Sequence, residues 1–181
     1  MPLQVVKGDP AAAQMYWTGI GLKGCFRYDV DMGGFAVAHN TQTTALGTSG
    51  AGSCQIILVH KAPGHGALGH YAGDARPDRI VAGVQRMIQH LGGLPVAHVL
   101  FAAGMTGNQR QEQLNYEIGI VSRVKEICPR ARITWPTTPQ GDVWGCCYYL
   151  PLEERVGLRI DSVGGFTGSG DAASGITAFA Y

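Results

Sequence analysis

Short stretches with the residue pattern of β-strands occupy both ends of the chain. Before residue 60 they are apolar or alternating runs between glycine-containing turns, and after residue 140 two more flank a charged turn at Glu153 and Glu154. Runs of this kind, bounded by turn-forming residues, are typical of strands. The predicted strands are residues 24–30, 34–40, 54–60, 142–152 and 155–163. The Gly- and Ser-rich tail after residue 163 is expected to be an edge or a loop.

The middle of the chain has helical periodicity. Residues 77–93 carry apolar side chains at helical spacing, open with Pro and Asp and stop at a glycine pair, which together are good end signals for a helix. Residues 108–129 show a second apolar face and end at a proline. Apolar runs at 97–104 and 131–137 are predicted strands, so the middle is expected to read strand, helix, strand, helix, strand.

This order of elements predicts an α+β fold, a layered α/β sandwich with mixed β-sheets and helices packed on one side. The chain has 181 residues, with no internal repeat and no linker rich enough to divide it. That length suffices for a substantial apolar core, so residues 1–181 are expected to form a single domain.

Charge and composition exclude some partners. Lys and Arg number 14 against 13 Asp and Glu, and no basic run occurs, so nucleic acid is not an expected partner. The first twenty residues lack the pattern of a secretory signal, and no apolar run approaches membrane-spanning length. The five cysteines are an odd number without a CxxC pair, which favours a reduced compartment and argues against a zinc site.

Cys54 has the surroundings that nucleophilic cysteine chemistry needs. Such chemistry requires a thiolate, a base, a group that orients the base, and backbone N–H donors for an oxyanion. Cys54 opens an apolar run just after "TSGAGS", whose small residues at Gly50, Gly52 and Ser53 leave backbone amides uncovered, and Thr48 lies six residues upstream. A cysteine at the start of an apolar strand is, however, most often a small buried hydrophobic residue.

Three histidines follow Cys54 as candidate bases. His60 ends the predicted strand and is interpreted as a polar cap or surface residue, and His65 lies between two glycines in an expected loop. His70 follows "GAL-G" with Tyr71 behind it, which is the pattern of a second short strand that folds back beside the first. At about 3.3 Å per residue, a returning antiparallel strand would bring His70 toward Cys54 and leave His65 near the far end.

These residues resemble a known family, the cysteine-dependent protein glutamine deamidases typified by the chemoreceptor deamidase CheD, with cytotoxic necrotizing factor and Burkholderia lethal factor as toxin relatives. The resemblance lies in Thr48 and Cys54 of "TSGAGSC", followed after 16 residues by His70 in "GALGHY". It implies a catalytic Cys54, His70 and Thr48 and a CheD-like or cytotoxic necrotizing factor-like fold. The toxin relatives place their histidine nearer the cysteine, so His65 is the alternative base.

The resemblance implies hydrolysis of a glutamine side chain in a target protein, without a metal or an organic cofactor. The enzyme would be a bacterial cytosolic modifier, or an effector or toxin passed directly into a target cell, and an adaptor or immunity protein would suit the second role. Two other classes of function remain open. One is another cysteine hydrolase, transglutaminase-like or peptidase-like, and the other is a non-enzymatic binding module in which Cys54 only packs.

Overall fold

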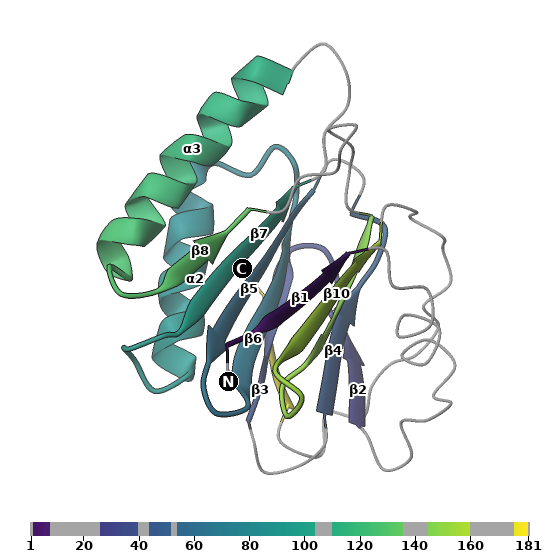
Figure 1. Ribbon diagram of the computed structural model, residues 1–181. Helices are drawn as coiled ribbons and strands as arrows, with labels where there is room; N and C mark the ends of the chain where they lie inside the picture. The colour runs from purple at the N-terminus through teal and green to yellow at the C-terminus, as the bar shows by residue number, and fades with distance from the viewer. Residues whose placement is uncertain are drawn as a thin grey trace.

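The protein is a sandwich of two β-sheets with two helices against one of them, as the computed structural model shows for residues 2–7, 26–39, 44–51, 54–103, 110–135, 145–159 and 176–180 (Figure 1). These described residues form three layers: the helices, a six-stranded sheet and a five-stranded sheet. An α+β fold with mixed sheets is therefore confirmed.

The six-stranded sheet has the order β11-β3-β6-β5-β7-β8 and supplies the strand pair that carries Cys54 and His70. All its pairs are antiparallel except β7 with β8. The central strand β5 is buried over six of its seven residues, which agrees with its continuous apolar sequence. The strands are β3 (Gly34–Ala38), β5 (Gln55–Lys61), β6 (His65–Tyr71), β7 (His98–Ala103), β8 (Arg132–Thr134) and β11 (Ile176–Ala180).

The five-stranded sheet has the order β1-β10-β9-β4-β2 and is also mixed. Its two outer pairs, β1 with β10 and β2 with β4, are parallel, whereas β9 runs antiparallel to both of its neighbours. The strands are β1 (Gln4–Lys7), β2 (Phe26–Asp29), β4 (Thr44–Thr48), β9 (Cys146–Leu150) and β10 (Arg155–Arg159).

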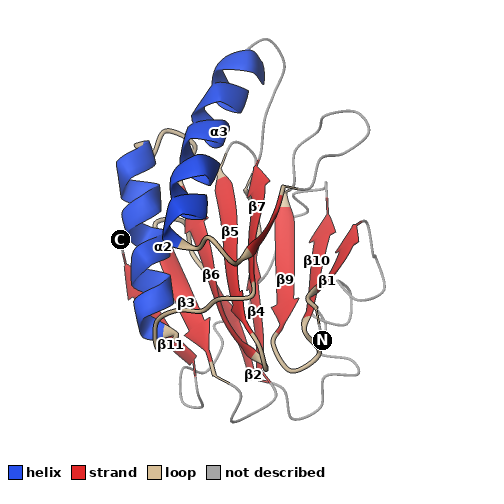
Figure 2. Cartoon of the chain, turned by 60° about the vertical axis from the view of Figure 1, so that its left-hand side comes forward, coloured by secondary structure: helices blue, strands red, loops and turns tan. Residues whose placement is uncertain are grey.

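Helices α2 (Pro77–His90) and α3 (Arg110–Ile127) lie side by side on the face of the six-stranded sheet that points away from the second sheet (Figure 2). The predicted apolar face of α2 is the buried one, and Ile80, Val84 and Met87 pack there against Val99 and other sheet residues. A second apolar cluster fills the space between the two sheets, where alternate residues of each strand point inward.

The elements that the sequence did not predict are strands β1 and β4. Strand β4 is a short run of mostly small residues, "TALGT", with weak strand propensity. It is a strand because it pairs with β2 on one side and β9 on the other. Residues 176–180 of the tail form the edge strand β11. His65 was expected in a loop, but it is the first residue of β6 and pairs with Lys61.

Candidate functional site

Cys54 and His70 come from adjacent antiparallel strands. His70 pairs with Ile56, and Cys54 lies two residues before Ile56, immediately ahead of β5. Cys54, Ile56 and Leu58 all belong to the apolar cluster between the sheets, so Cys54 and His70 are diagonal neighbours facing the same layer. The predicted return of the chain toward Cys54 is confirmed, because β6 runs antiparallel beside β5.

Thr48 approaches His70 from the opposite sheet. It is the last residue of β4 and is fully buried, and its Oγ1 lies 2.7 Å from His70 Nδ1. The same hydroxyl donates to the carbonyl oxygen of Val30 at 2.7 Å. Since a threonine hydroxyl has one proton, it accepts a hydrogen bond from Nδ1–H of His70. The neutral ring is therefore the Nδ1–H tautomer, and Nε2 keeps its lone pair.

The Nε2 atom of His70 has no hydrogen-bond partner among the described residues, although the side chain is buried. The pKa of His70 is lowered, first because burial disfavours the imidazolium; the Val30 carbonyl and the Asp31 carboxylate oppose this effect. A neutral buried imidazole with a free Nε2 is the form that accepts a proton. This nitrogen makes no hydrogen bond to Cys54, although we expected the thiol within hydrogen-bond reach.

The Cys54 thiol is covered instead by Met32. The cysteine is 8% exposed, and its Sγ lies 3.8 Å from Sδ of Met32. Burial raises the pKa of the Cys54 thiol, as does the Asp74 carboxylate, while the backbone N–H of Gly73 directed at the sulfur lowers it. The resting pair is therefore a thiol and a neutral imidazole, not a thiolate–imidazolium ion pair.

The predicted oxyanion residues are only partly placed. Gly50 is exposed at the end of β4 and has a φ of +69°, a conformation that a glycine adopts without strain. Gly52 and Ser53 lie outside the described residues. The N–H of Cys54 itself donates to the carbonyl of Ala51 at 3.0 Å, so that amide is engaged in this structure.

His65, the alternative base, is at the other end of the strand pair. It faces Lys61, about 20 Å along β5 from the Cys54 end at 3.3 Å per residue. Its Nδ1 lies 3.4 Å from Nδ1 of His39. Burial and the charges of His39 and Lys61 lower its pKa. His65 is thus separated from Cys54 by the length of β5.

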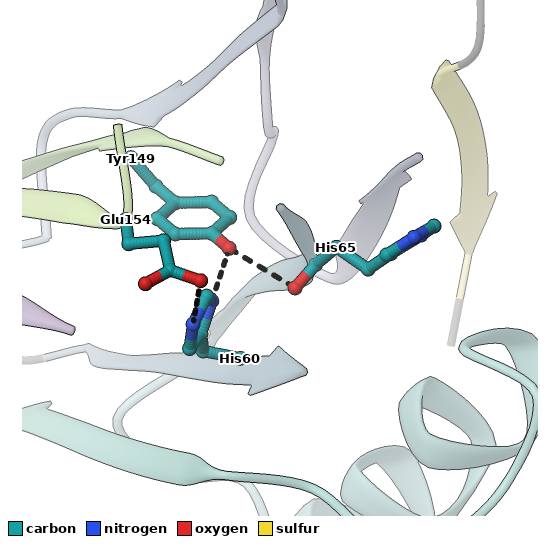
Figure 3. Close-up of polar contacts among 4 residues, drawn as sticks. All are labelled: His60, His65, Tyr149 and Glu154. Atoms are coloured by element: carbon teal, nitrogen blue, oxygen red, sulfur yellow. Dashed lines mark hydrogen bonds and ion pairs between the residues drawn. The ribbon is translucent and has the colours of Figure 1, made fainter. Parts of the chain in front are cut away.

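A second polar cluster links the sheets near that far end (Figure 3). His60 Nδ1 lies 2.6 Å from the hydroxyl of Tyr149, which donates to the carbonyl of His65 at 3.1 Å. His60 Nε2 is 3.7 Å from a carboxylate oxygen of Glu154. His60 was interpreted as a polar cap or a surface residue, and a surface position was wrong, because its side chain is buried. Glu154 does lie in the predicted turn between β9 and β10, but its side chain is buried as well. They are buried because β9 and its turn close over β5, a long-range contact that a local pattern does not reveal.

Sequence reasoning missed two residues that surround the candidate site. Val30 supplies the carbonyl that orients Thr48, and Met32 covers the thiol. Both follow β2, in the segment that leads to the turn before β3. The only signal in the sequence is the turn pattern "DMGG", which predicts a bend but not its position over Cys54.

The described residues contain no group of three or more His, Cys, Asp or Glu side chains arranged to hold a metal ion. Among the described residues, Cys54, Cys128 and Cys147 are free thiols. Neither described helix is long and apolar enough to cross a membrane.

Comparison with known proteins adds no relatives to this picture. No protein-family model matches the sequence, and no curated protein matches it significantly.

Proposed function

We propose that the protein is a cysteine-dependent protein glutamine deamidase, with Cys54 as nucleophile, His70 as base and Thr48 as the residue that orients the base. One observation carries the proposal. The hydrogen bonds from His70 Nδ1–H to Thr48 and from Thr48 to the Val30 carbonyl leave Nε2 of His70 unprotonated and buried, without a partner among the described residues, on the strand beside Cys54.

A buried imidazole nitrogen without a hydrogen bond is costly, by about 1–3 kcal/mol, so folded proteins rarely retain one without a reason. Proton transfer from a neighbouring thiol would provide that reason. The arrangement follows the logic of a catalytic triad, in which a third group fixes the tautomer of the base. Thr48 is neutral and stabilises an imidazolium less than a carboxylate does, which makes charge separation before substrate binds unfavourable.

The reaction then begins from the neutral pair. As the Cys54 sulfur attacks the glutamine carboxamide carbon, its proton passes to Nε2 of His70, and the tetrahedral intermediate forms with its negative charge on oxygen. The intermediate collapses, the C–N bond breaks, and His70 gives the proton to the departing ammonia. Water, deprotonated by the same Nε2, attacks the thioester, and the thiolate leaves and recovers the proton. The products are a glutamate side chain, ammonia and the free enzyme.

The order of Thr, Cys and His along this chain and the two mixed sheets with helices on one side support a CheD-like or cytotoxic necrotizing factor-like fold. The substrate is then a target protein in which one neutral carboxamide becomes a charge, which is enough to alter a binding surface. We further propose an effector or toxin role, with a cytosolic modifier as the other form of the same activity.

The proposal is tested with a benzyloxycarbonyl-Gln-Gly dipeptide and a panel of candidate target proteins. The wild type should release ammonia and raise the intact mass of a substrate by about one mass unit for each glutamine hydrolysed, since –OH replaces –NH₂. Cys54→Ser and His70→Ala should do neither. Incorporation of an added amine would indicate a transglutaminase-like enzyme, and chain cleavage a peptidase. No ammonia, no amine incorporation and no chain cleavage with any of these substrates would indicate a binding module.

A further inference from the structure

Met32 occupies an unusual position for a large apolar residue. The residue is 62% exposed, yet its sulfur lies 3.8 Å from the sulfur of Cys54, a residue that is only 8% exposed. It belongs to the turn between β2 and β3, in which Gly33 has a φ of +87° and Gly34 N–H donates to the carbonyl of Asp31 at 3.2 Å. The N–H of Gly33 also donates to the carbonyl of His70 at 2.8 Å.

These hydrogen bonds fix the backbone of the turn to the strand that carries His70, while the Met32 side chain is mostly surrounded by solvent. A methionine has three rotatable side-chain bonds and a polarizable thioether, so it fills irregular space and changes rotamer at small cost. The turn therefore fixes the backbone of Met32 and leaves the end of its side chain able to move away from Cys54.

A cavity of about 260 Å³ adjoins this turn. Its walls include Met32 itself and Val30, whose carbonyl accepts the hydrogen bond from Thr48. The remaining walls are Tyr28, Asp31, Gly33, Gly34, Phe35 and Phe179. Met32 thus both lines the cavity and contacts the thiol, whereas Cys54 and His70 are not among the residues that line it. Its volume lies just below the usual range for ligand sites, about 300–1,000 Å³, and suits one or two amino-acid side chains rather than a large cofactor.

We propose that Met32 is a displaceable cover on the Cys54 thiol, and that the cavity is the subsite for the polypeptide segment that flanks the target glutamine. The identity of this substrate segment rests on the proposed function. When the segment enters the cavity, the Met32 side chain leaves the thiol, and the carboxamide takes its place. Until a substrate binds, Met32 restricts the access of water and small thiol reagents to the nucleophile.

The cover is tested by alkylation of Cys54, which requires no knowledge of the substrate. The rate of reaction with iodoacetamide is measured over a range of pH. Peptide mapping quantifies the alkylation of Cys54 separately from that of the other cysteines. Met32→Ala should raise the limiting rate at high pH about tenfold or more, the change expected if the thiol is uncovered for a tenth of the time or less. The midpoint of the pH profile should fall as well, because burial raises the pKa of the Cys54 thiol and Met32→Ala reduces that burial.

Two variants serve as controls. Met32→Leu keeps a large apolar side chain over the thiol and should alkylate within about twofold of the wild type, the residue being close in volume. Leu152→Ala removes an exposed apolar side chain from the β9–β10 turn and should have no effect on Cys54. Thermal unfolding of each variant establishes that it is folded at the assay temperature. A Met32→Ala rate equal to the wild-type rate, or an equal rise in Leu152→Ala, would overturn the cover.

The subsite is tested by comparing the alkylation of Cys54 by N-benzyl iodoacetamide and by iodoacetamide. Each Cys54 rate is divided by the rate of the same reagent with glutathione, and the ratio of the two normalised rates, benzyl reagent over iodoacetamide, is the result. If the cavity accepts the flanking group, the benzyl reagent should react preferentially with Cys54 in the wild type; a ratio at or below one would refute the subsite. Neither alkylation result depends on the proposed function. The proposed function would be refuted separately, if no glutamine substrate released ammonia. If the function holds, Met32→Ala should speed hydrolysis of a dipeptide more than that of a protein.

Discussion

The substitution Thr48→Val removes one hydroxyl and nearly preserves the shape of the side chain. In the wild type that hydroxyl donates to the Val30 carbonyl and accepts from His70 Nδ1–H, each at 2.7 Å. All of Thr48 is buried, so water does not replace the lost partner. The substitution therefore leaves a buried ring N–H and a carbonyl to find new hydrogen bonds.

The magnitude follows from these two groups. A buried donor left without a partner costs about 1–3 kcal/mol, so the free energy of unfolding should fall by that amount. The imidazole has a way to reduce the cost: it can move its proton to Nε2, which places the lone pair on Nδ1. That rearrangement removes the base from the Cys54 side of the ring. Turnover should then fall, although less than in His70→Ala, which has no proton acceptor at all.

The assay combines urea unfolding with ¹⁵N NMR of the His70 ring, whose two nitrogen shifts distinguish the tautomers. Thr48→Ser is the matched control, because it keeps the hydroxyl and loses a methyl group, at a cost of about 1 kcal/mol. The two variants should be destabilised by similar amounts, but only Thr48→Val should lose the Nδ1–H tautomer. A Thr48→Val protein that keeps both the tautomer and the wild-type stability would refute the reasoning.

Three further predictions concern stability and the nucleophile. Burial and the charges of Arg132 and His60 lower the pKa of His98 to about 4. The contribution of His98 to the free energy of unfolding should therefore be complete above about pH 6.5 and fall by up to about 3 kcal/mol as the pH drops toward 4. In urea titrations, His98→Gln should reduce this dependence of stability on pH. Gly66→Ala should destabilise the protein by about 1–3 kcal/mol, because the added Cβ would lie 2.3 Å from the Tyr149 ring. In Gly119→Ala the added Cβ on α3 meets open space, so this substitution should stabilise the protein by about 0.5–1 kcal/mol. Thermal unfolding of the two variants tests both predictions. Cys54→Ala should abolish ammonia release and leave the melting temperature nearly unchanged. A large drop in melting temperature with activity retained would show that Cys54 contributes to packing and not to catalysis.

The fold was predictable where local pattern and burial agree. The apolar face of α2, with its Pro77 start, defined the helix, and the continuous apolar run before His60 defined the buried strand β5. Strand β4 was not predictable, because its small residues have weak strand propensity and become ordered only between two partners distant in sequence. The pairing of the strands into two sheets likewise depends on contacts that no window of sequence contains.

The candidate site was predictable in its residue types but not in its surroundings. The spacing of Cys54 and His70 predicts adjacent antiparallel strands, and the structure has them. The Thr48–His70 hydrogen bond joins two sheets, so only the assembled sandwich reveals its geometry. Met32 could not be assigned to the site from sequence, since its contact with the thiol depends on how the turn after β2 lies across the end of β5.

The central claim is that the Cys54 thiol attacks a glutamine carboxamide with His70 as its base. The most direct measurement is labelling by a peptide in which the glutamine is replaced by its diazoketone analogue, followed by intact-mass spectrometry and peptide mapping. The account predicts one adduct per chain, on Cys54, suppressed by excess glutamine peptide but not by the matching alanine peptide, and lost in His70→Ala. An adduct on Cys128, Cys146 or Cys147, or labelling of Cys54 that neither the glutamine peptide nor His70→Ala diminishes, would contradict it.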